Sequence, residues 1–125
     1  MQSNMLITSE CCRALGNLSH YAQVQKIFDD NGADKILHQL LDSSDINLVV
    51  NVIGIFINFS LIKSDLKLFV ESTYSGVETG DQNLNSGIFK LLVTIREFND
   101  WRVSTLTLQL IWNLLRKTKQ VIQNY

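Results

Sequence analysis

The stretch DINLVVNVIGIFINFS, residues 45–60, most constrains the fold, because its pattern occurs three times in the chain. Its last six residues, IFINFS, match ALGNLS at residues 14–19 and LIWNLL at residues 110–115, which aligns Asn58 with Asn17 and Asn113. Asn17 and Asn58 lie 41 residues apart, within the spacing of about 40–47 residues found in helical repeats. Asn58 and Asn113 lie 55 apart, so the last copy carries 14 additional residues.

The spacing before each asparagine also repeats. A glycine, an aspartate and an asparagine follow one another at intervals of 13 residues, and this series occurs twice. The two series are Gly32, Asp45 and Asn58, and Gly87, Asp100 and Asn113.

The repeated stretch is predicted to be helical, although its Val, Ile and Phe content favours a strand by propensity. Its apolar residues do not alternate strictly and fall at helical spacing. These are Leu48, Val52, Ile55, Phe56 and Phe59, which align with Val103, Thr107, Leu110, Ile111 and Leu114 and with Ile7, Cys11, Ala14, Leu15 and Leu18. Because the apolar surface of the middle copy is wider than one stripe, we expect this helix to be buried on most sides.

The chain reads as one all-α domain, residues 1–125, built as a superhelical solenoid. A partial repeat at 4–19 supplies only a third helix, and two three-helix repeats follow at 20–60 and 61–125. We expect helices at 22–30, 33–41 and 45–60, then at 65–71, 87–98 and from Trp101 toward Gln123. Residues 73–86 read as an inserted surface loop, with a binding loop as the alternative.

Local signals agree with these boundaries. Gly32 supplies the left-handed residue that a helix end favours, and Asp45 and Asp100 are candidate N-caps. Glycine inside a helix costs about 1 kcal/mol relative to alanine, so Gly16 and Gly54 predict a close approach between helices.

The first helix has no earlier helices of its own unit in this sequence. A repeat cannot bury its apolar face alone, so we expect Ile7, Cys11 and Leu15 to be exposed unless something covers them. We therefore expect a piece or isoform of a longer array, which is marginally stable or self-associates through this N-terminal edge.

Composition excludes several function classes. A net charge of −1, from 11 basic and 12 acidic residues, gives no broad electrostatic footprint for nucleic acid or an anionic membrane. The most apolar window, residues 48–62, has 15 residues, three of them polar. A membrane span needs about 20 mostly apolar residues.

The absence of proline fits a helical chain. Cys11 and Cys12 are adjacent and read as two small buried residues, with a redox or metal role as the alternative. Reduced thiols indicate an intracellular compartment.

No catalytic, metal or cofactor pattern is present in the sequence. His20 and His38 lack metal-ligand spacing such as HxxxH, and the nucleophile and phosphate-loop motifs are missing. We therefore expect no enzyme, no cofactor and no metal.

The asparagine series is the one specific candidate for a site. An amide side chain offers donors and an acceptor, so a row of asparagines can bind the backbone of an extended peptide. Alternatively, each asparagine ties its own helix to the neighbouring loop. The candidate groove residues are Asn17, Asn58 and Asn113, together with Arg13, Asn51 and Gln109.

With these two series of glycine, aspartate and asparagine, the chain resembles the armadillo repeat family from residue 4 to about residue 117, apart from the insertion at 73–86. The resemblance implies three-helix units in a right-handed superhelix, with third helices lining a concave face whose asparagines contact partner peptides. Nuclear import adaptors of this family carry a tryptophan four residues before each asparagine. Here those positions hold Arg13, Gly54 and Gln109, which argues against recognition of basic import signals.

Several segments look like the carboxyl-terminal repeats of armadillo proteins of cilia and sperm flagella. They are LGNLS at 15–19, LLDSSD at 40–45, IGIFINFS at 53–60, DW at 100–101 and LIWN at 110–113. This likeness implies a non-catalytic adaptor in axoneme assembly, in the cytoplasm or the cilium, that binds other proteins. A general armadillo peptide-binding module in signalling or nuclear transport is the alternative.

Overall fold

The computed structural model describes residues 2–62 and 87–123, and side chains within 4–62, 90–116 and at 123. These parts of the chain are all-α, as predicted, and contain no strand. The predicted helix at 65–71 and the predicted insertion at 73–86 lie outside the described residues. The helices are α1 (Gln2–Leu18), α2 (Ala22–Asp30), α3 (Ala33–Leu40), α4 (Ile46–Ile62), α6 (Gly87–Phe98) and α7 (Trp101–Gln123).

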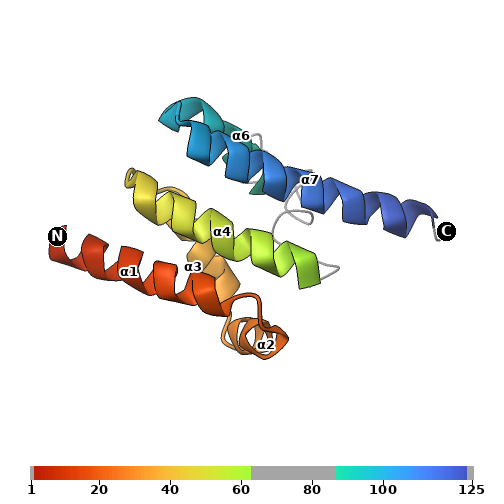
Figure 1. The fold of residues 1–125 in the computed structure, drawn as a ribbon, viewed down its shortest axis with the longest axis horizontal. Helices are drawn as coiled ribbons and strands as arrows, with labels where there is room; N and C mark the ends of the chain where they lie inside the picture. The colour runs from red at the N-terminus through yellow and green to blue at the C-terminus, as the bar shows by residue number, and fades with distance from the viewer. Residues whose placement is uncertain (1, 63–86, 124–125) are drawn as a thin grey trace, which may run out of the picture.

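Three long helices, α1, α4 and α7, lie side by side, and we call them the row (Figure 1). They are the three copies of the repeated stretch. Helix α4 lies in the middle and packs most extensively against α1 and α7. The shorter α2 and α3 pack together, α3 also contacts α4, and α6 packs against α7. Helices that are far apart in the sequence therefore share one layer.

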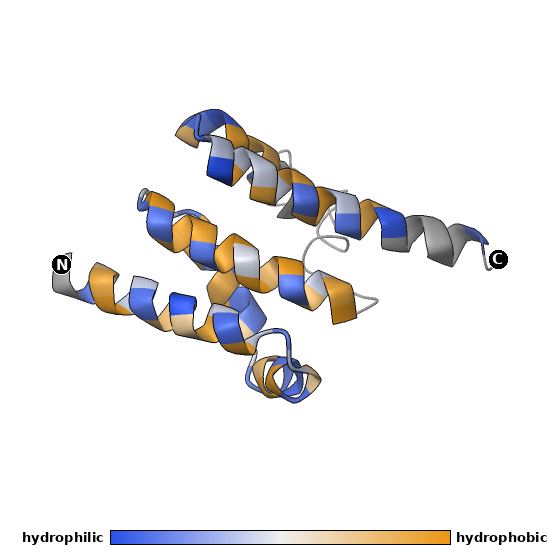
Figure 2. Ribbon diagram, in the orientation of Figure 1, coloured by the Kyte–Doolittle hydropathy of each residue, from blue (hydrophilic) through white to orange (hydrophobic). Residues whose placement is uncertain are grey.

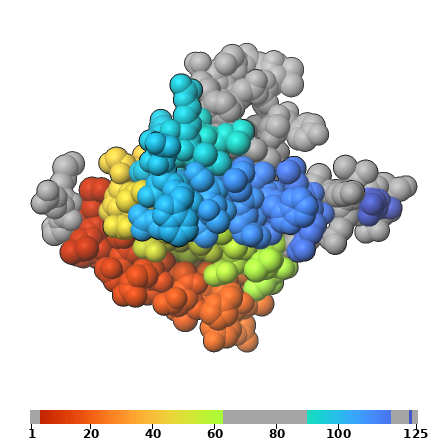
Figure 3. Space-filling view, turned by 45° about the horizontal axis from the view of Figure 1, so that its top comes forward, coloured from red at the N-terminus to blue at the C-terminus, as the bar shows by residue number. Residues whose placement is uncertain are grey.

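The core is centred on α4, whose surface is the most continuously apolar of the row (Figure 2). Its predicted apolar positions are all buried, and the Phe28 and Phe59 rings meet edge to face with centroids 5.3 Å apart. In the space-filling view, α4 lies between α1 and α7 and is largely covered (Figure 3). This burial explains why a sequence with strand-like propensity is helical, since packing overrides local preference.

The two aspartates predicted as N-caps are confirmed, whereas α3 ends one residue earlier than predicted and α4 continues to Ile62. Asp45 Oδ1 accepts a hydrogen bond from the backbone N–H of Asn47 at 2.9 Å, and Asp100 Oδ1 accepts one from Arg102 at 2.9 Å. Gly32 has φ +64° between α2 and α3, where a left-handed residue was expected. Each aspartate satisfies N–H groups that have no partner inside the helix.

Helix α1 leaves much of its apolar surface open. Ile7 and Cys11 are exposed, as predicted, whereas Leu15 is half-buried. The prediction that both cysteines are buried is wrong for Cys11, since only Cys12 lies in the core. Successive helical residues point about 100° apart, and on α1 this turn carries Cys11 onto the exposed side of the helix. Burial, and then the neighbouring Cys11, raise the pKa of the Cys12 thiol.

The prediction that Gly54 allows a close approach between helices is wrong. A Cβ atom built on Gly54 would meet no neighbouring atom within 4 Å. At Gly16 the nearest atom would be Cγ1 of Ile55 at 3.9 Å, which is ordinary van der Waals contact. Neither position needs glycine to let helices approach.

Replacing Phe56 with alanine should destabilise the fold by about 3–5 kcal/mol, because it empties a fully buried site in the centre of the core. Urea unfolding followed by circular dichroism measures the change. Ile27→Ala is the control, because Ile27 is exposed on α2. This substitution should change the free energy of unfolding by no more than about 0.5 kcal/mol. Equal losses in the two variants would contradict a core centred on α4.

Candidate functional site

All six predicted partner-binding residues lie on the row. Arg13 and Asn17 belong to α1, Asn51 and Asn58 to α4, and Gln109 and Asn113 to α7. The structure thus places them on three adjacent helices. Their side chains, however, differ in what they contact.

The amide of Asn58 connects α4 to the end of α1. Its Nδ2 donates to Oγ of Ser19 at 2.8 Å and to the backbone oxygen of Gly16 at 3.2 Å. Ser19 Oγ in turn donates to the Gly16 oxygen at 2.8 Å, and Ser19 is fully buried. Asn58 therefore satisfies the last turn of the neighbouring helix, whose carbonyls have no partners within α1.

The amide of Asn113 makes the equivalent contact one helix further along the row. Its Nδ2 donates to Oγ of Ser60 at 2.9 Å, and Ser60 Oγ donates to the backbone oxygen of Ile57 at 2.6 Å. Gln109 Nε2 donates to Oδ1 of Asn113 at 3.0 Å, so both ends of the amide are used. Asn113 is only 3% exposed.

We call these two contacts, Asn58 with Ser19 and Asn113 with Ser60, the asparagine–serine braces. The paired residues lie 39 apart in the first brace and 53 apart in the second. The difference equals the 14 additional residues of the last copy. The braces are therefore the same contact made twice.

Two further amides join helices. Asn51 Nδ2 donates to the backbone oxygen of Ser9 at 3.2 Å. Gln25 on α2 is 2% exposed, and its Nε2 donates to the backbone oxygens of Ser19 at 3.0 Å and Asn58 at 3.3 Å. Gln25 thus links the ends of α1 and α4 from a third helix.

These contacts match the alternative in which asparagines tie helices together, with a neighbouring helix in place of a loop. The donors of Asn51, Asn58 and Asn113 are engaged within the fold. Arg13 pairs with Glu10 at 2.7 Å in an exposed contact, which raises the Arg13 pKa chiefly through the hydrogen bond. Asn17 is exposed and has no side-chain hydrogen bond to the described residues.

Sequence reasoning missed the serines and Gln25. Ser19 and Ser60 were visible as the last residue of ALGNLS and IFINFS, and the third copy has Leu115 there. Each of these serines ends a copy that is followed by another copy with the aligned asparagine, and this pairing was the signal that could have revealed the contact. Nothing in the sequence marked Gln25, which lies at an apolar helix face.

A second link between repeats lies behind the row. Lys90 of α6 pairs with Asp42, in the turn after α3, with 2.9 Å between Nζ and Oδ2. His38, near the end of α3, is half-buried. Burial lowers its pKa below the ordinary 6.5, and the Lys90 charge acts in the same direction.

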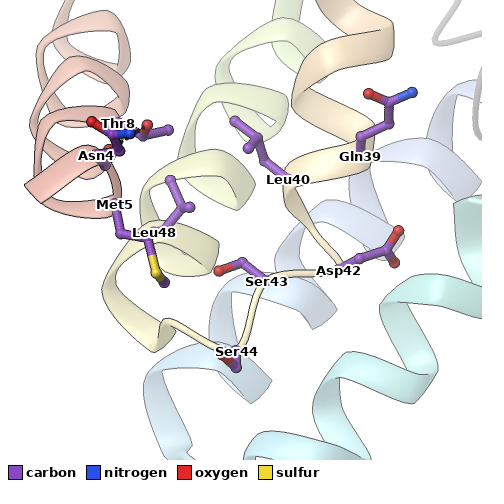
Figure 4. Close-up of a pocket in the computed structure, with 9 residues that line it drawn as sticks. All are labelled: Asn4, Met5, Thr8, Gln39, Leu40, Asp42, Ser43, Ser44 and Leu48. Carbon is purple, nitrogen blue, oxygen red and sulfur yellow. Dashed lines mark hydrogen bonds between the residues drawn. The ribbon is translucent and has the colours of Figure 1, made fainter. Parts of the chain in front are cut away.

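A pocket of about 480 Å³ lies between the start of α1, the end of α3 and the start of α4 (Figure 4). Met5, Leu40 and Leu48 line it beside polar groups of the α3–α4 turn. Ser43 in this turn aligns with Phe98, which packs against the core before α7. Ser43 lies in the turn after α3, whereas Phe98 is the last residue of α6, so the chain is folded differently at the two aligned positions.

The described part of the chain shows neither a metal site nor a membrane span. Residues 2–62 and 87–123 hold no group of three or more His, Cys, Asp or Glu side chains placed to bind a metal. No helix in this part of the chain combines the length and apolarity needed to cross a membrane. No protein-family model, curated protein or solved structure matches the chain.

Replacing Asn58 with alanine should lower the free energy of unfolding by roughly 1–3 kcal/mol, because two hydrogen bonds between helices are lost. Asn17→Ala is the matched control, since the same residue type at the aligned position makes no such bond and should cost within about 0.5 kcal/mol. Chemical denaturation of both variants tests this. An Asn58→Ala protein as stable as wild type would show that the brace does not hold the row together.

Stability should also fall as pH decreases below about 6.5. His38 has a lowered pKa in the fold, so the unfolded chain binds its proton first and is favoured as pH falls toward the folded value. Urea unfolding at pH 7.5 and 5.5 measures the change, and His38→Gln should flatten it. An unchanged slope in the variant would assign the effect to other groups.

Proposed function

We propose that this chain is a non-catalytic protein-interaction module that binds an extended segment of a partner across the row. The binding surface in this proposal is the row face, defined by the aligned residues Arg13, Gly54 and Gln109. Equivalent braces orient the row helices alike, so aligned residues lie on the same side. Arg13 and Gln109 are exposed.

The observation that carries the proposal is Gly54. A glycine inside a helix costs about 1 kcal/mol relative to alanine, and here open space surrounds the position a Cβ would take. Packing within the fold therefore does not account for it. A glycine on an open surface lets a partner's backbone approach closely, and Gly54 lies at the centre of the middle helix.

The dimensions fit an extended segment. Packed helices lie about 8–10 Å apart, so the row measures roughly 16–20 Å between the outer axes. An extended chain advances about 3.3 Å per residue, so five or six residues cross the row. Asn58 Oδ1, one turn after Gly54 on α4, and Gln109 Oε1 on α7 offer hydrogen bonds to a partner's backbone.

The resemblance noted in the sequence supports a finer assignment. In this proposal the row is the third-helix layer of a right-handed armadillo-type solenoid, and the chain is an adaptor in axoneme assembly of cilia, including the sperm flagellum. It acts in the cytoplasm or the cilium on protein partners. The general alternative, a peptide-binding module in signalling or nuclear transport, is weakened for import signals by Gly54 and its aligned neighbours.

Selection of peptides from a displayed linear library against the full chain tests the binding face. Selected peptides should bind wild type, and Gly54→Trp should weaken their affinity at least tenfold by filling the open space. Ile27→Trp, on the exposed side of α2, is the matched control and should bind like wild type. Equal binding by both variants would place the site elsewhere.

Gly54→Ala separates folding from binding. It should raise the free energy of unfolding by up to about 1 kcal/mol, because alanine favours the helix and the new methyl group meets nothing. Denaturant unfolding measures this gain. A loss of stability would show that the glycine serves the fold, which would remove the main support for the proposal.

Proximity labelling with the full chain in ciliated cells tests the biological setting. Neighbours from the axoneme or its transport machinery are expected. Neighbours confined to nuclear pores or signalling complexes would favour the general alternative and leave the binding face itself unaffected.

A further inference from the structure

The side of α1 away from α4, which we call the upstream face, has the same residue pattern as the faces that are paired within the fold. Ile7, Cys11 and Leu18 align with Leu48, Val52 and Phe59 of α4. The α4 residues are buried, whereas Ile7 is 61% exposed, and Cys11 and Leu18 are exposed too. The apolar residues that neighbouring helices cover on α4 are thus exposed at the aligned positions of α1.

Asn17 completes this pattern with a polar group. It aligns with Asn58 and Asn113, which both donate to a serine hydroxyl in the last turn of the preceding row helix. Asn17 is exposed and has no such partner among the described residues. A partner on the upstream face that repeats the asparagine–serine contact would place a serine hydroxyl beside Asn17.

A charged residue behind the row gives a second, independent requirement. Lys90 of α6 follows Gly87 by three residues and pairs with Asp42 of the preceding unit. Lys35 of α3 follows Gly32 by three residues, is exposed, and pairs with no acid in the described parts of the chain. The same occupant would place a carboxylate near Lys35.

We propose that the upstream face is a stacking surface for a helical-repeat partner that is not a second copy of this chain. The occupant is a helical unit that ends in a long helix. The last turn of this helix carries a serine hydroxyl for Asn17, and the connection before this helix carries a carboxylate for Lys35. Its apolar side covers Ile7, Cys11 and Leu18. This surface is distinct from the row face and does not depend on peptide binding there.

The far end of this chain meets the carboxylate requirement, because Glu97 aligns with Asp42, but it does not meet the hydroxyl requirement. On α7 the residue aligned with Ser19 and Ser60 is Leu115, which is 55% exposed, so a second copy would offer Asn17 no hydroxyl. Trp112 aligns with Gly16 and Ile57 and is 64% exposed, so it adds bulk at the position where the row helices meet. Head-to-tail stacking of copies would therefore give the Asn17 amide no serine hydroxyl at the aligned position.

An internal duplication supplies a suitable occupant. A chain of residues 1–44 followed directly by residues 4–125 keeps the 41-residue register, and Asn4 takes the N-cap position of Asp45. In this chain Ser19 of the first copy lies one unit before Asn17 of the second copy. The duplicated unit also brings the aspartate of its turn near the second Lys35.

Thiol labelling reads out the docking directly. In wild type, Cys11 is exposed and Cys12 buried, so a maleimide reagent should label one thiol quickly. In the duplicated chain, with the first-copy Cys11 replaced by serine, labelling of the second Cys11 should be at least tenfold slower than in wild type. Unchanged labelling of the second Cys11 would overturn the proposal.

The hydroxyl requirement is tested in the same duplicated chain. First-copy Ser19→Ala, or second-copy Asn17→Ala, should lower its melting temperature by as much as Asn58→Ala lowers that of wild type. In the original chain, Asn17→Ala should leave the melting temperature unchanged. A duplicated chain indifferent to both substitutions would overturn the proposed chemistry.

Sedimentation of the wild-type chain tests the exclusion of a second copy. A monomer at about 100 µM is expected. Concentration-dependent oligomers that dissociate when Ile7 is replaced by Asp, but persist when Leu115 is replaced by Asp, would indicate pairing of upstream faces. Oligomers lost in both variants would indicate head-to-tail stacking. Either result would overturn the choice of partner.

Discussion

Burial of α4 is the constraint on which the rest of the described structure depends. Its Val, Ile and Phe side chains face α1 on one side, α7 on the other and α3 behind. Such a helix has little reason to form alone, since its residues favour strands by propensity. It is helical because three neighbours cover it, and those neighbours are ordered because α4 offers them an apolar surface.

Apolar packing alone does not fix how far one helix slides along another, and the asparagine–serine braces supply that register. Each brace joins a defined amide to a defined hydroxyl, and each serine also satisfies a carbonyl in the last turn of its own helix. A shift of one helical turn would separate the Asn58 and Asn113 Nδ2 groups from these hydroxyls, and leaving such donors unpaired is costly. The same contact made twice gives the row helices the same orientation.

This use of the asparagines changes which groups are free to act on a partner. Three of the residues first considered for a groove, Asn51, Asn58 and Asn113, hold the scaffold. Arg13 and Gln109 are exposed on the outer helices of the row, and Gly54 lies between them on the middle helix. Because these asparagine side chains hold the helices in register, recognition of a partner would depend on the shape of the row face and on the remaining amide groups. The two surfaces proposed for interaction, the row face and the upstream face, follow from this division.

The sequence by itself determined the helical class, the repeat register, and the helix ends at 22–30, 87–98 and 101–123, because periodicity, caps and the left-handed Gly32 are local signals. Only the tertiary structure decided that Asn58 and Asn113 donate to serines of a preceding helix, that Gln25 joins two helix ends, and that Gly54 borders open space. These facts depend on which helices meet and how they are rotated, and residues 39 and 53 apart carry no local signal of that contact.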